Sequence, residues 1–262
     1  MRIYVLALLV TLQACAGFNK DITVGWTNER LYTEAKDELA NGGYDKAIGY
    51  FEKLETRAIG TPLGQQAQIE KAFTQYKAGE QAAALITLDR FIRLHPASPL
   101  VDYALFLRGL VNFNDNLGFL SGFTGQTLTE RDQKAAKESY QTFQSLVTRF
   151  PDSKYSKDAQ ARMAYILNTL SAYEIHVARY YFTRGAYLAA ANRAQTAISE
   201  YPKAPSVEEA LEILIRSYDL LGSVQLRDDA KRVMASSFPK NKLGKITAVN
   251  GTTDSSNPTQ KR

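Results

Sequence analysis

The sequence predicts an all-α fold, an α-solenoid built from about five helical hairpins. Three glycine–proline pairs share one spacing of seventeen positions: Gly79 and Pro96, Gly185 and Pro202, Gly222 and Pro239. Between the members of each pair, small or apolar residues recur every three or four positions, which places them on one face of a helix. No segment shows the sustained alternation of polar and apolar residues that is typical of a strand. Equal spacing and helical periodicity together indicate a repeated pair of helices.

The N-terminal residues, 1–14, are expected to form a cleaved export signal. Arg2 supplies its positive charge, and the apolar run from Ile3 to Val10 is too short to span a bilayer. The only cysteine of the chain, Cys15, follows directly. With a single cysteine, the fold cannot rest on disulfide bonds and depends on packing.

The sequence Leu-Gln-Ala-Cys at residues 12–15 resembles the lipobox of bacterial lipoproteins. The lipobox implies an S-diacylglycerol and an N-acyl group on Cys15, a stable anchor of three acyl chains, and a lipidated linker over residues 15–28. Ala16 stands where an aspartate would retain an enteric lipoprotein at the inner membrane, so we expect the periplasmic face of the outer membrane. The alternative is an ordinary signal peptide with a chance cysteine, because Gln13 is unusual in a lipobox.

The segment from residue 29 to 242 follows the pattern of the tetratricopeptide repeat. In that repeat a small residue closes the turn between helix A and helix B, and a proline opens the link to the next repeat. The glycine–proline pairs match these two roles. In the first repeat, Gly42-Gly43-Tyr44 makes the turn and the link runs through Gly60-Thr61-Pro62. The five repeats are expected at about residues 29–62, 63–98, 99–154, 155–205 and 206–242.

Two of these repeats depart from the pattern. In the third, helix A and helix B are separated by an insertion from Asn114 to Asp132, and loops of this length are usually functional or disordered. The stretch from Ser156 to Arg184 contains no proline or glycine, which predicts one helix of about eight turns entering the fourth repeat. A helix longer than its partner has to protrude or be covered by something else. The polar composition of residues 243–262 is typical of a flexible tail.

No catalytic or metal-binding motif accompanies the predicted helices. His95 and His176 are the only histidines, and neither has a second histidine at i+3 or i+4, so we expect both to be structural. Nucleophile, phosphate-binding and dinucleotide-binding motifs are absent from the sequence. The formal net charge of +5 comes from basic residues spread among acidic ones, which disfavours nucleic acid as a partner. We therefore expect a binding protein without metal or cofactor, and not an enzyme.

Six strings stand in order along the chain: Asp89-Arg90-Phe91-Ile92-Arg93-Leu94, Arg108-Gly109-Leu110, Phe150-Pro151, Tyr180-Tyr181, Arg184-Gly185-Ala186 and Asn192-Arg193. Together with the lipobox and the insertion, they resemble the BamD family, the lipoprotein subunit of the machinery that folds β-barrels into the outer membrane of Gram-negative bacteria. The resemblance extends to about Pro239 and leaves out only the tail. It implies a lipid-anchored periplasmic scaffold of that machinery.

The resemblance also implies the partners and the residues that meet them. C-terminal repeats would contact the last periplasmic domain of the barrel subunit BamA and, where present, the lipoprotein BamC. Arg193, with Tyr187 nearby, falls in the fourth repeat on the segment that matches the BamA-facing region. A guanidinium there suits a carboxylate on the partner, because its planar fork donates two parallel hydrogen bonds. The alternative is a solvated helix charge.

In the same family, N-terminal repeats are proposed to receive the C-terminal targeting strand of an unfolded outer-membrane protein. Four aromatic residues of the first two repeats could line a groove for such a strand: Tyr32, Phe73, Tyr76 and Phe91. The alternative is that at least half of them belong to the interhelical core, above all Phe91.

Two other functions compete with this one. A different tetratricopeptide-repeat lipoprotein could serve pilus or cell-wall assembly. The enzyme class is represented by a lipid-anchored cell-wall hydrolase, which would need a carboxyl with a raised pKa in a cleft. Glu208-Glu209 and Asp228-Asp229 are adjacent pairs that a helix directs to different sides, so they do not form such a dyad.

Overall fold

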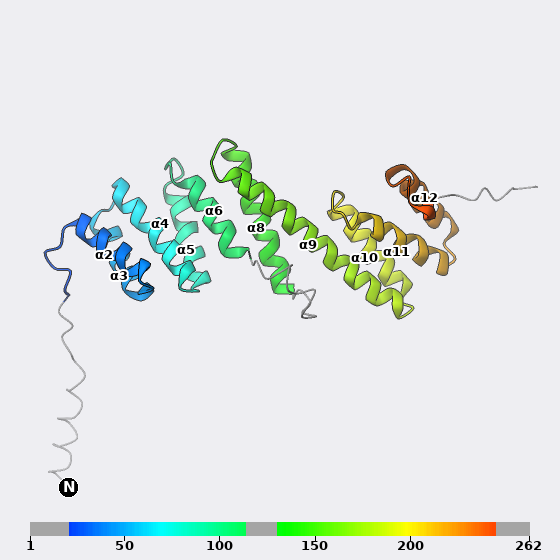
Figure 1. Cartoon of the computed structure of the whole chain (residues 1–262), viewed down its shortest axis with the longest axis horizontal. Helices are drawn as coiled ribbons and strands as arrows, with labels where there is room; N and C mark the ends of the chain where they lie inside the picture. Colours follow the sequence, from blue (N-terminus) through cyan, green and yellow to red (C-terminus); the bar gives the residue numbers. More distant parts are fainter. Residues whose placement is uncertain (1–20, 114–129, 245–262) are drawn as a thin grey trace, which may run out of the picture. The chain divides into compact units, whose positions relative to one another are not determined.

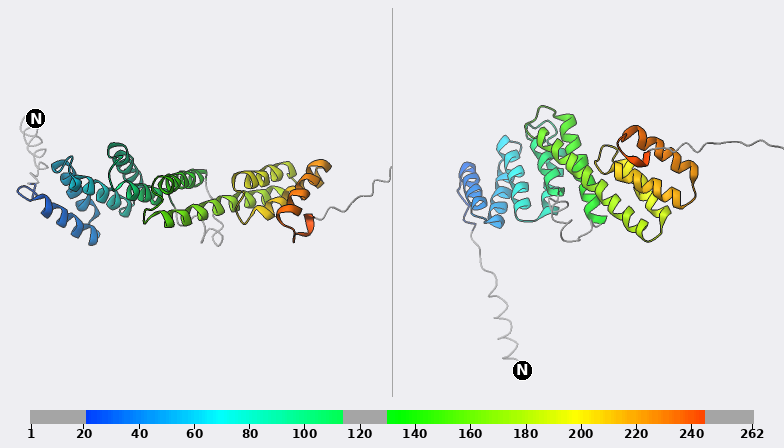
Figure 2. Two further views of the ribbon diagram at one scale, coloured as in Figure 1. Left: turned by 90° about the horizontal axis from the view of Figure 1, so that it is seen from above. Right: turned by 45° about the vertical axis from the view of Figure 1, so that its right-hand side comes forward.

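The computed structural model describes residues 21–113 and 130–244. All regular elements within these ranges are helices (Figures 1 and 2). They fall into two compact units that divide between Ala104 and Leu105. Cys15, most of the predicted insertion and nearly all of the predicted tail lie outside the described residues.

The first unit contains two helical hairpins and the first residues of a third. Its helices are α2 (Asn28–Ala40), α3 (Tyr44–Arg57), α4 (Pro62–Lys77), α5 (Gln81–Leu94) and the beginning of α6 (Val101–Asn112). Helix α2 packs on α3, α3 on α4, and α4 on α5. Leu31, Phe51 and Leu54 form part of the first core and are fully buried. Each helix therefore buries its apolar stripe against the next helix in the chain.

The second unit continues the same architecture. It holds the rest of α6, then α8 (Glu130–Arg149), α9 (Ser156–Thr183), α10 (Tyr187–Glu200), α11 (Val207–Leu220), α12 (Val224–Ser237) and the short 3-10 helix η2 (Lys242–Gly244). Phe106 of α6 stacks on Tyr155 with ring centroids 4.9 Å apart, and Phe143 of α8 is fully buried beside it. Successive antiparallel helices thus pair in both units, and the predicted fold class is confirmed.

Glycine turns set the start of four helices. Gly42, Gly79, Gly185 and Gly222 have φ angles of +77°, +81°, +75° and +69°, and helices α3, α5, α10 and α12 each begin two residues later. All four helices are 14 residues long. A positive φ is costly for any residue with a Cβ atom, so glycine at these positions allows the chain to reverse between helix A and helix B.

The predicted link between the first two hairpins ends in a helix cap. Thr61 lies at the N-cap of α4 and its hydroxyl accepts a hydrogen bond from the Gly64 amide at 3.1 Å. Pro62 occupies the first turn, where no backbone donor is needed. This cap fixes where α4 begins.

An ion-pair network ties three consecutive helices of the first unit together. The Glu55 carboxylate of α3 accepts from Lys71 of α4 and from Arg90 of α5, both at 2.7 Å. The Lys71 side chain is buried, so the pair holds its charge inside the unit. The network therefore fixes the rotation of α4 relative to α3 and α5, and with it the direction of the opposite face of α4.

Helix α9 confirms the predicted long helix. It has 28 residues, twice the length of α10, and it packs against both α8 and α10. Its extra length is covered by a neighbouring helix and does not protrude.

The insertion differs slightly from its predicted bounds. Helix α8 already begins at Glu130, so the last three residues of the predicted insertion belong to a helix.

Candidate functional site

Three of the four aromatic residues that the sequence assigned to a substrate groove lie on helices α2 and α4. Tyr32, Phe73 and Tyr76 are each half-buried, so part of every ring is accessible. Phe91 is different, because its side chain is fully buried in the core between α4 and α5. It offers no surface to a ligand, and its ring packs against His95 at 5.1 Å.

A polar cluster on the same helices centres on Glu70. Its carboxylate accepts hydrogen bonds from Tyr32 at 3.3 Å, Lys36 at 3.0 Å and Gln66 at 3.1 Å. Burial, with the nearby Glu70 charge, raises the pKa of the Tyr32 phenol. Tyr32 is therefore a neutral donor that is already engaged within the protein.

A hollow of about 580 Å³ opens at the N-terminal end of α4. It is lined by the first residues of α4 and by the link after α5, including Pro62, Gln66, Leu94, His95 and Pro99. Sequence reasoning missed it, because it forms where two proline-containing links that are far apart in the chain come together. Across the hollow, the Ser98 hydroxyl donates to Gln65 at 2.7 Å.

The hollow and the aromatic pair lie along one face of α4. Gln66, Glu70 and Phe73 follow one another at helical spacings of four and three, and Tyr76 comes three residues later. Gln66 lines the hollow and also bonds Glu70. The 16 residues of α4 extend over about 24 Å, the length of about seven residues of extended chain. Helix α4 thus offers a surface with the dimensions of a short strand.

The second predicted site lies on α10 in the second unit. Arg193 donates to Glu174 of α9 at 3.2 Å, and its side chain is 44% exposed whereas that of Glu174 is only 8% exposed. Tyr187 is half-buried and its ring meets that of Phe182 edge to face at 5.4 Å. The sequence did not predict that Arg193 has a partner inside the chain. One side of the guanidinium is bound and the rest of it remains open to solvent.

Apolar side chains are also exposed at one edge of the second unit. The turns that join α9 to α10 and α11 to α12 are at the same edge of the unit (Figure 1). Large apolar side chains are exposed around both turns: Tyr180, Leu188, Leu220, Leu221, Val224 and Leu226. Exposed apolar side chains at one edge of a unit are candidates for a contact with a partner.

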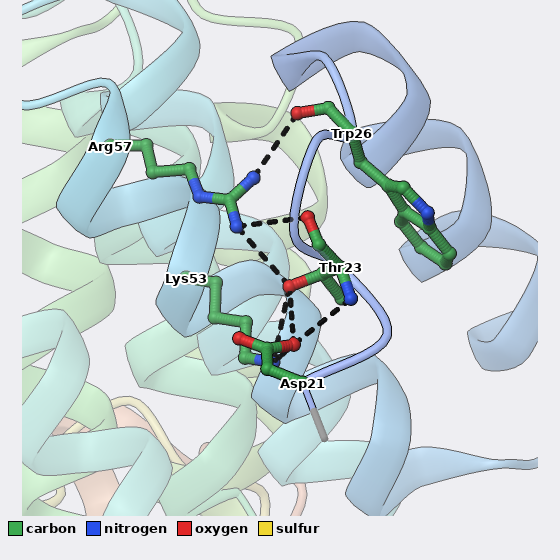
Figure 3. A network of polar contacts seen from close by, with 5 residues as sticks. All are labelled: Asp21, Thr23, Trp26, Lys53 and Arg57. Atoms are coloured by element: carbon green, nitrogen blue, oxygen red, sulfur yellow. Dashed lines mark hydrogen bonds and ion pairs between the residues drawn. The ribbon is translucent and has the colours of Figure 1, made fainter.

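The residues that precede α2 are fixed on the first hairpin (Figure 3). Asp21 accepts from Lys53 of α3 at 2.6 Å and from the amide and hydroxyl of Thr23 at 3.0 and 2.7 Å. Arg57 donates to the Thr23 carbonyl at 3.1 Å and to the Trp26 carbonyl at 3.2 Å. We call these five residues the N-terminal clamp. The predicted linker therefore ends in an ordered loop.

Residues 21–113 and 130–244 contain neither a metal site nor a membrane span. No group of three or more His, Cys, Asp or Glu side chains there could hold a metal ion. His95 is the C-cap residue of α5, and His176 lies exposed on α9. None of the helices in this part of the chain is both long and apolar enough to cross a bilayer.

Comparison with known proteins gives a consistent result. The model of the YfiO family, described as outer membrane lipoprotein, matches residues 26–233. Relatives named outer membrane protein assembly factor BamD include one from Neisseria meningitidis serogroup A that is 46% identical over 239 residues, covering 89% of this chain and 90% of the relative. The relative from Xylella fastidiosa strain Temecula1 is 33% identical over 235 residues, with 89% and 80% covered. The relative from Haemophilus influenzae is 31% identical over 229 residues, with 87% of each chain covered.

Among solved structures, a thermophilic tetratricopeptide-repeat protein from Thermus thermophilus aligns with 82% of this chain and 93% of its own. The identity is 14% and the TM-score is 0.36. A likeness this weak adds nothing to what the helix pairing already shows.

Proposed function

Because this chain belongs to the BamD family of outer-membrane lipoproteins, we propose that it is an outer-membrane protein assembly factor. It would act as a non-enzymatic periplasmic scaffold, held on the outer membrane by lipids on Cys15. The observation that carries the proposal is the 46% identity to the Neisseria meningitidis factor over 89% of the chain, a span that includes both helical units. No single motif could account for a match of this length.

The second unit is proposed to bind the periplasmic domain of BamA. Arg193 is half-exposed and Glu174 fixes its orientation through one nitrogen, so its remaining N–H groups are pre-oriented toward solvent. The apolar side chains around the two turns would supply the desolvated part of the contact, with Tyr187 as an aromatic neighbour. BamC would also bind the C-terminal repeats where the organism has it, and other lipoproteins of the machinery would join the same scaffold.

The first unit is proposed to receive the targeting strand of unfolded outer-membrane proteins. The exposed parts of Phe73 and Tyr76 and the hollow beside Pro62 lie along one helix face of suitable length. Glu70 and its donors add polar groups to which an extended backbone could hydrogen-bond. Tyr32 takes part by holding the Glu70 carboxylate in place through its phenol, and Phe91 only as core support.

A binding experiment with matched arginine variants tests the BamA contact. Arg193→Ala and Arg193→Lys are compared with Arg90→Ala, because the Arg90 side chain is 42% exposed and is paired with Glu55 at 2.7 Å in the first unit. Truncating one partner of an interfacial charge pair costs about 2–5 kcal/mol, which is at least about thirtyfold in affinity. We expect that loss for Arg193→Ala, a partial loss for Arg193→Lys and none for Arg90→Ala. Titration of the folded proteins with the BamA periplasmic domain measures it.

The same experiment separates the interface from a stability effect. Removing Arg193 leaves Glu174 buried without its cation, which lowers stability by itself. The double variant Arg193→Ala/Glu174→Gln relieves that penalty. Weak BamA binding that persists in the double variant supports a direct contact, whereas recovered binding would move the interface away from Arg193.

The substrate surface is tested with a peptide from the C-terminal strand of a β-barrel protein. Phe73→Ala/Tyr76→Ala should weaken peptide binding and leave BamA binding unchanged, while Tyr140→Ala on α8 removes a half-buried ring of the second unit as a control. Unchanged peptide affinity would exclude this face of α4. Co-purification from solubilised outer membranes distinguishes the proposal from pilus or cell-wall assembly, because each would bring down different partners.

A further inference from the structure

The loop before α2 has its polar and apolar side chains in inverted positions. Thr23 is fully buried, whereas its neighbours Ile22 and Val24 are 66% and 73% exposed. In a loop that faces only water, the aliphatic side chains would be the ones to gain from burial. The inversion places two aliphatic side chains where an external apolar phase could receive them.

The N-terminal clamp makes this arrangement a fixed one. Thr23 is bonded through its amide, carbonyl and hydroxyl to Asp21, Lys53 and Arg57 (Figure 3). Asp21 is paired with Lys53, so the loop presents no unpaired carboxylate to an anionic surface. Ile22 and Val24 therefore protrude into solvent, while the polar groups of Asp21 and Thr23 hydrogen-bond to side chains of α3.

An aromatic and cationic group flanks the loop. The half-buried Trp26 ring contacts the Tyr50 ring at 5.7 Å, and the Arg30 guanidinium lies 4.5 Å from the Trp26 centroid. Tryptophan, tyrosine and arginine side chains are characteristic of the boundary between water and lipid headgroups, because they combine an apolar body with a polar tip. The composition of this end of the unit thus fits a phospholipid surface.

The length of the preceding chain limits how far the loop can be from Cys15. Six residue steps separate Cys15 from Asp21, and they span at most about 22 Å when fully extended. If acyl chains on Cys15 lie in the leaflet, as the proposed function requires, the loop stays within that distance of the headgroups. A weak contact then becomes an intramolecular one with a high effective concentration.

From these observations we infer that the loop Ile22–Trp26 is a membrane-surface contact, in which Ile22 and Val24 enter the interfacial layer of the phospholipid leaflet that holds the lipids of Cys15. The inference rests on the lipidation in the proposed function. Because Lys53 and Arg57 of the clamp fix the loop to α3, this contact holds the first hairpin in a defined orientation to the membrane.

The chain carries its own reporter for this contact, because Trp26 is its only tryptophan and Cys15 its only cysteine. Residues 15–262 are coupled through the Cys15 thiol to a maleimide lipid in vesicles of phosphatidylethanolamine and phosphatidylglycerol. Trp26 emission is compared in vesicles with and without bromine on the upper part of the acyl chains. We expect brominated lipid to quench Trp26 emission in the coupled protein. This quenching should be much stronger than in uncoupled protein mixed with the same vesicles.

Two variants separate insertion of the loop from mere proximity. Ile22→Ser/Val24→Ser should lose the extra quenching, whereas Ile86→Ser, which alters an isoleucine of similar exposure on α5, should keep it. Both replace exposed side chains, and circular dichroism checks that they fold. Equal quenching in coupled and uncoupled protein, or undiminished quenching in the double variant, would overturn the inference and leave the loop to a protein partner. Because the coupling is chemical, the outcome does not depend on whether cells lipidate Cys15.

Discussion

Replacing glycine by alanine should raise the stability of the protein at one position of the first unit and lower it at two others. Gly49 lies inside α3 and Gly79 lies in the turn before α5 with φ at +81°, and an added Cβ would meet no atom within 4 Å at either position. Gly64 lies in the first turns of α4, where an added Cβ would come within 2.2 Å of the Ala58 carbonyl oxygen. The three sites thus isolate helix propensity, backbone strain and steric overlap.

The expected magnitudes follow from these surroundings. Gly49→Ala should stabilise the protein by about 0.5–1 kcal/mol, because alanine loses less backbone entropy in a helix. Gly79→Ala should destabilise it by about 1 kcal/mol, since a left-handed backbone strains any residue with a Cβ. Gly64→Ala should destabilise it by about 1–3 kcal/mol, because the carbonyl it meets belongs to the backbone at the end of α3 and cannot rotate away.

Urea and thermal unfolding of the mature chain, followed by circular dichroism, measure these differences. A change of 1 kcal/mol shifts the melting temperature by about 2–4 °C in a chain of this size. All three sites lie in one compact unit, so they report on the same transition. If Gly79→Ala raised stability as Gly49→Ala does, the positive φ would carry no cost and the account of the helix turns would be wrong.

Two further predictions concern the N-terminus. Cys15→Ser should abolish lipidation, so that the protein stays uncut or is released from membranes, which mass spectrometry and fractionation detect; firm retention of an exported variant in cells depleted of BamA would contradict this. The hydrogen bond from Lys53 and those from Thr23 hold the pKa of Asp21 well below its usual range. Because the folded state has the lower pKa, the stability that Asp21 contributes is complete above its usual pKa of about 4 and is lost as pH falls below it. The difference in melting temperature between the native chain and Asp21→Asn should accordingly be largest near neutral pH and shrink in acid, and a constant difference would speak against the clamp.

Features that depend on neighbours in the sequence were predictable. Gly185 and Pro202 mark a turn and a link because each acts on its own backbone, and the length of α9 follows from the absence of both residue types between Ser156 and Arg184. The family resemblance is also confirmed, since it rested on specific strings spread over most of the chain.

Contacts between distant residues were not predictable. Arg193 and Glu174 lie on different helices, and only the register of α10 against α9 decides that they meet. Asp21 and Lys53 are 32 positions apart, and the short polar segment around Asp21 is typical of a linker until its partners are known. Phe91 carried two interpretations because helical spacing identifies a buried stripe but not which of its members also reaches a surface.

Helix α9 packs against both α8 and α10, and this affects how the second unit unfolds. In most repeat arrays each hairpin touches only its neighbours, so end repeats can open while the others stay closed. Helix α9 is one continuous helix of about 42 Å that is the partner of both α8 and α10. Opening the third hairpin alone would uncover half of α9 or unwind it in the middle, and both are costly. The two hairpins on α9 thus form one cooperative block, and local fluctuations are confined to the ends of the unit.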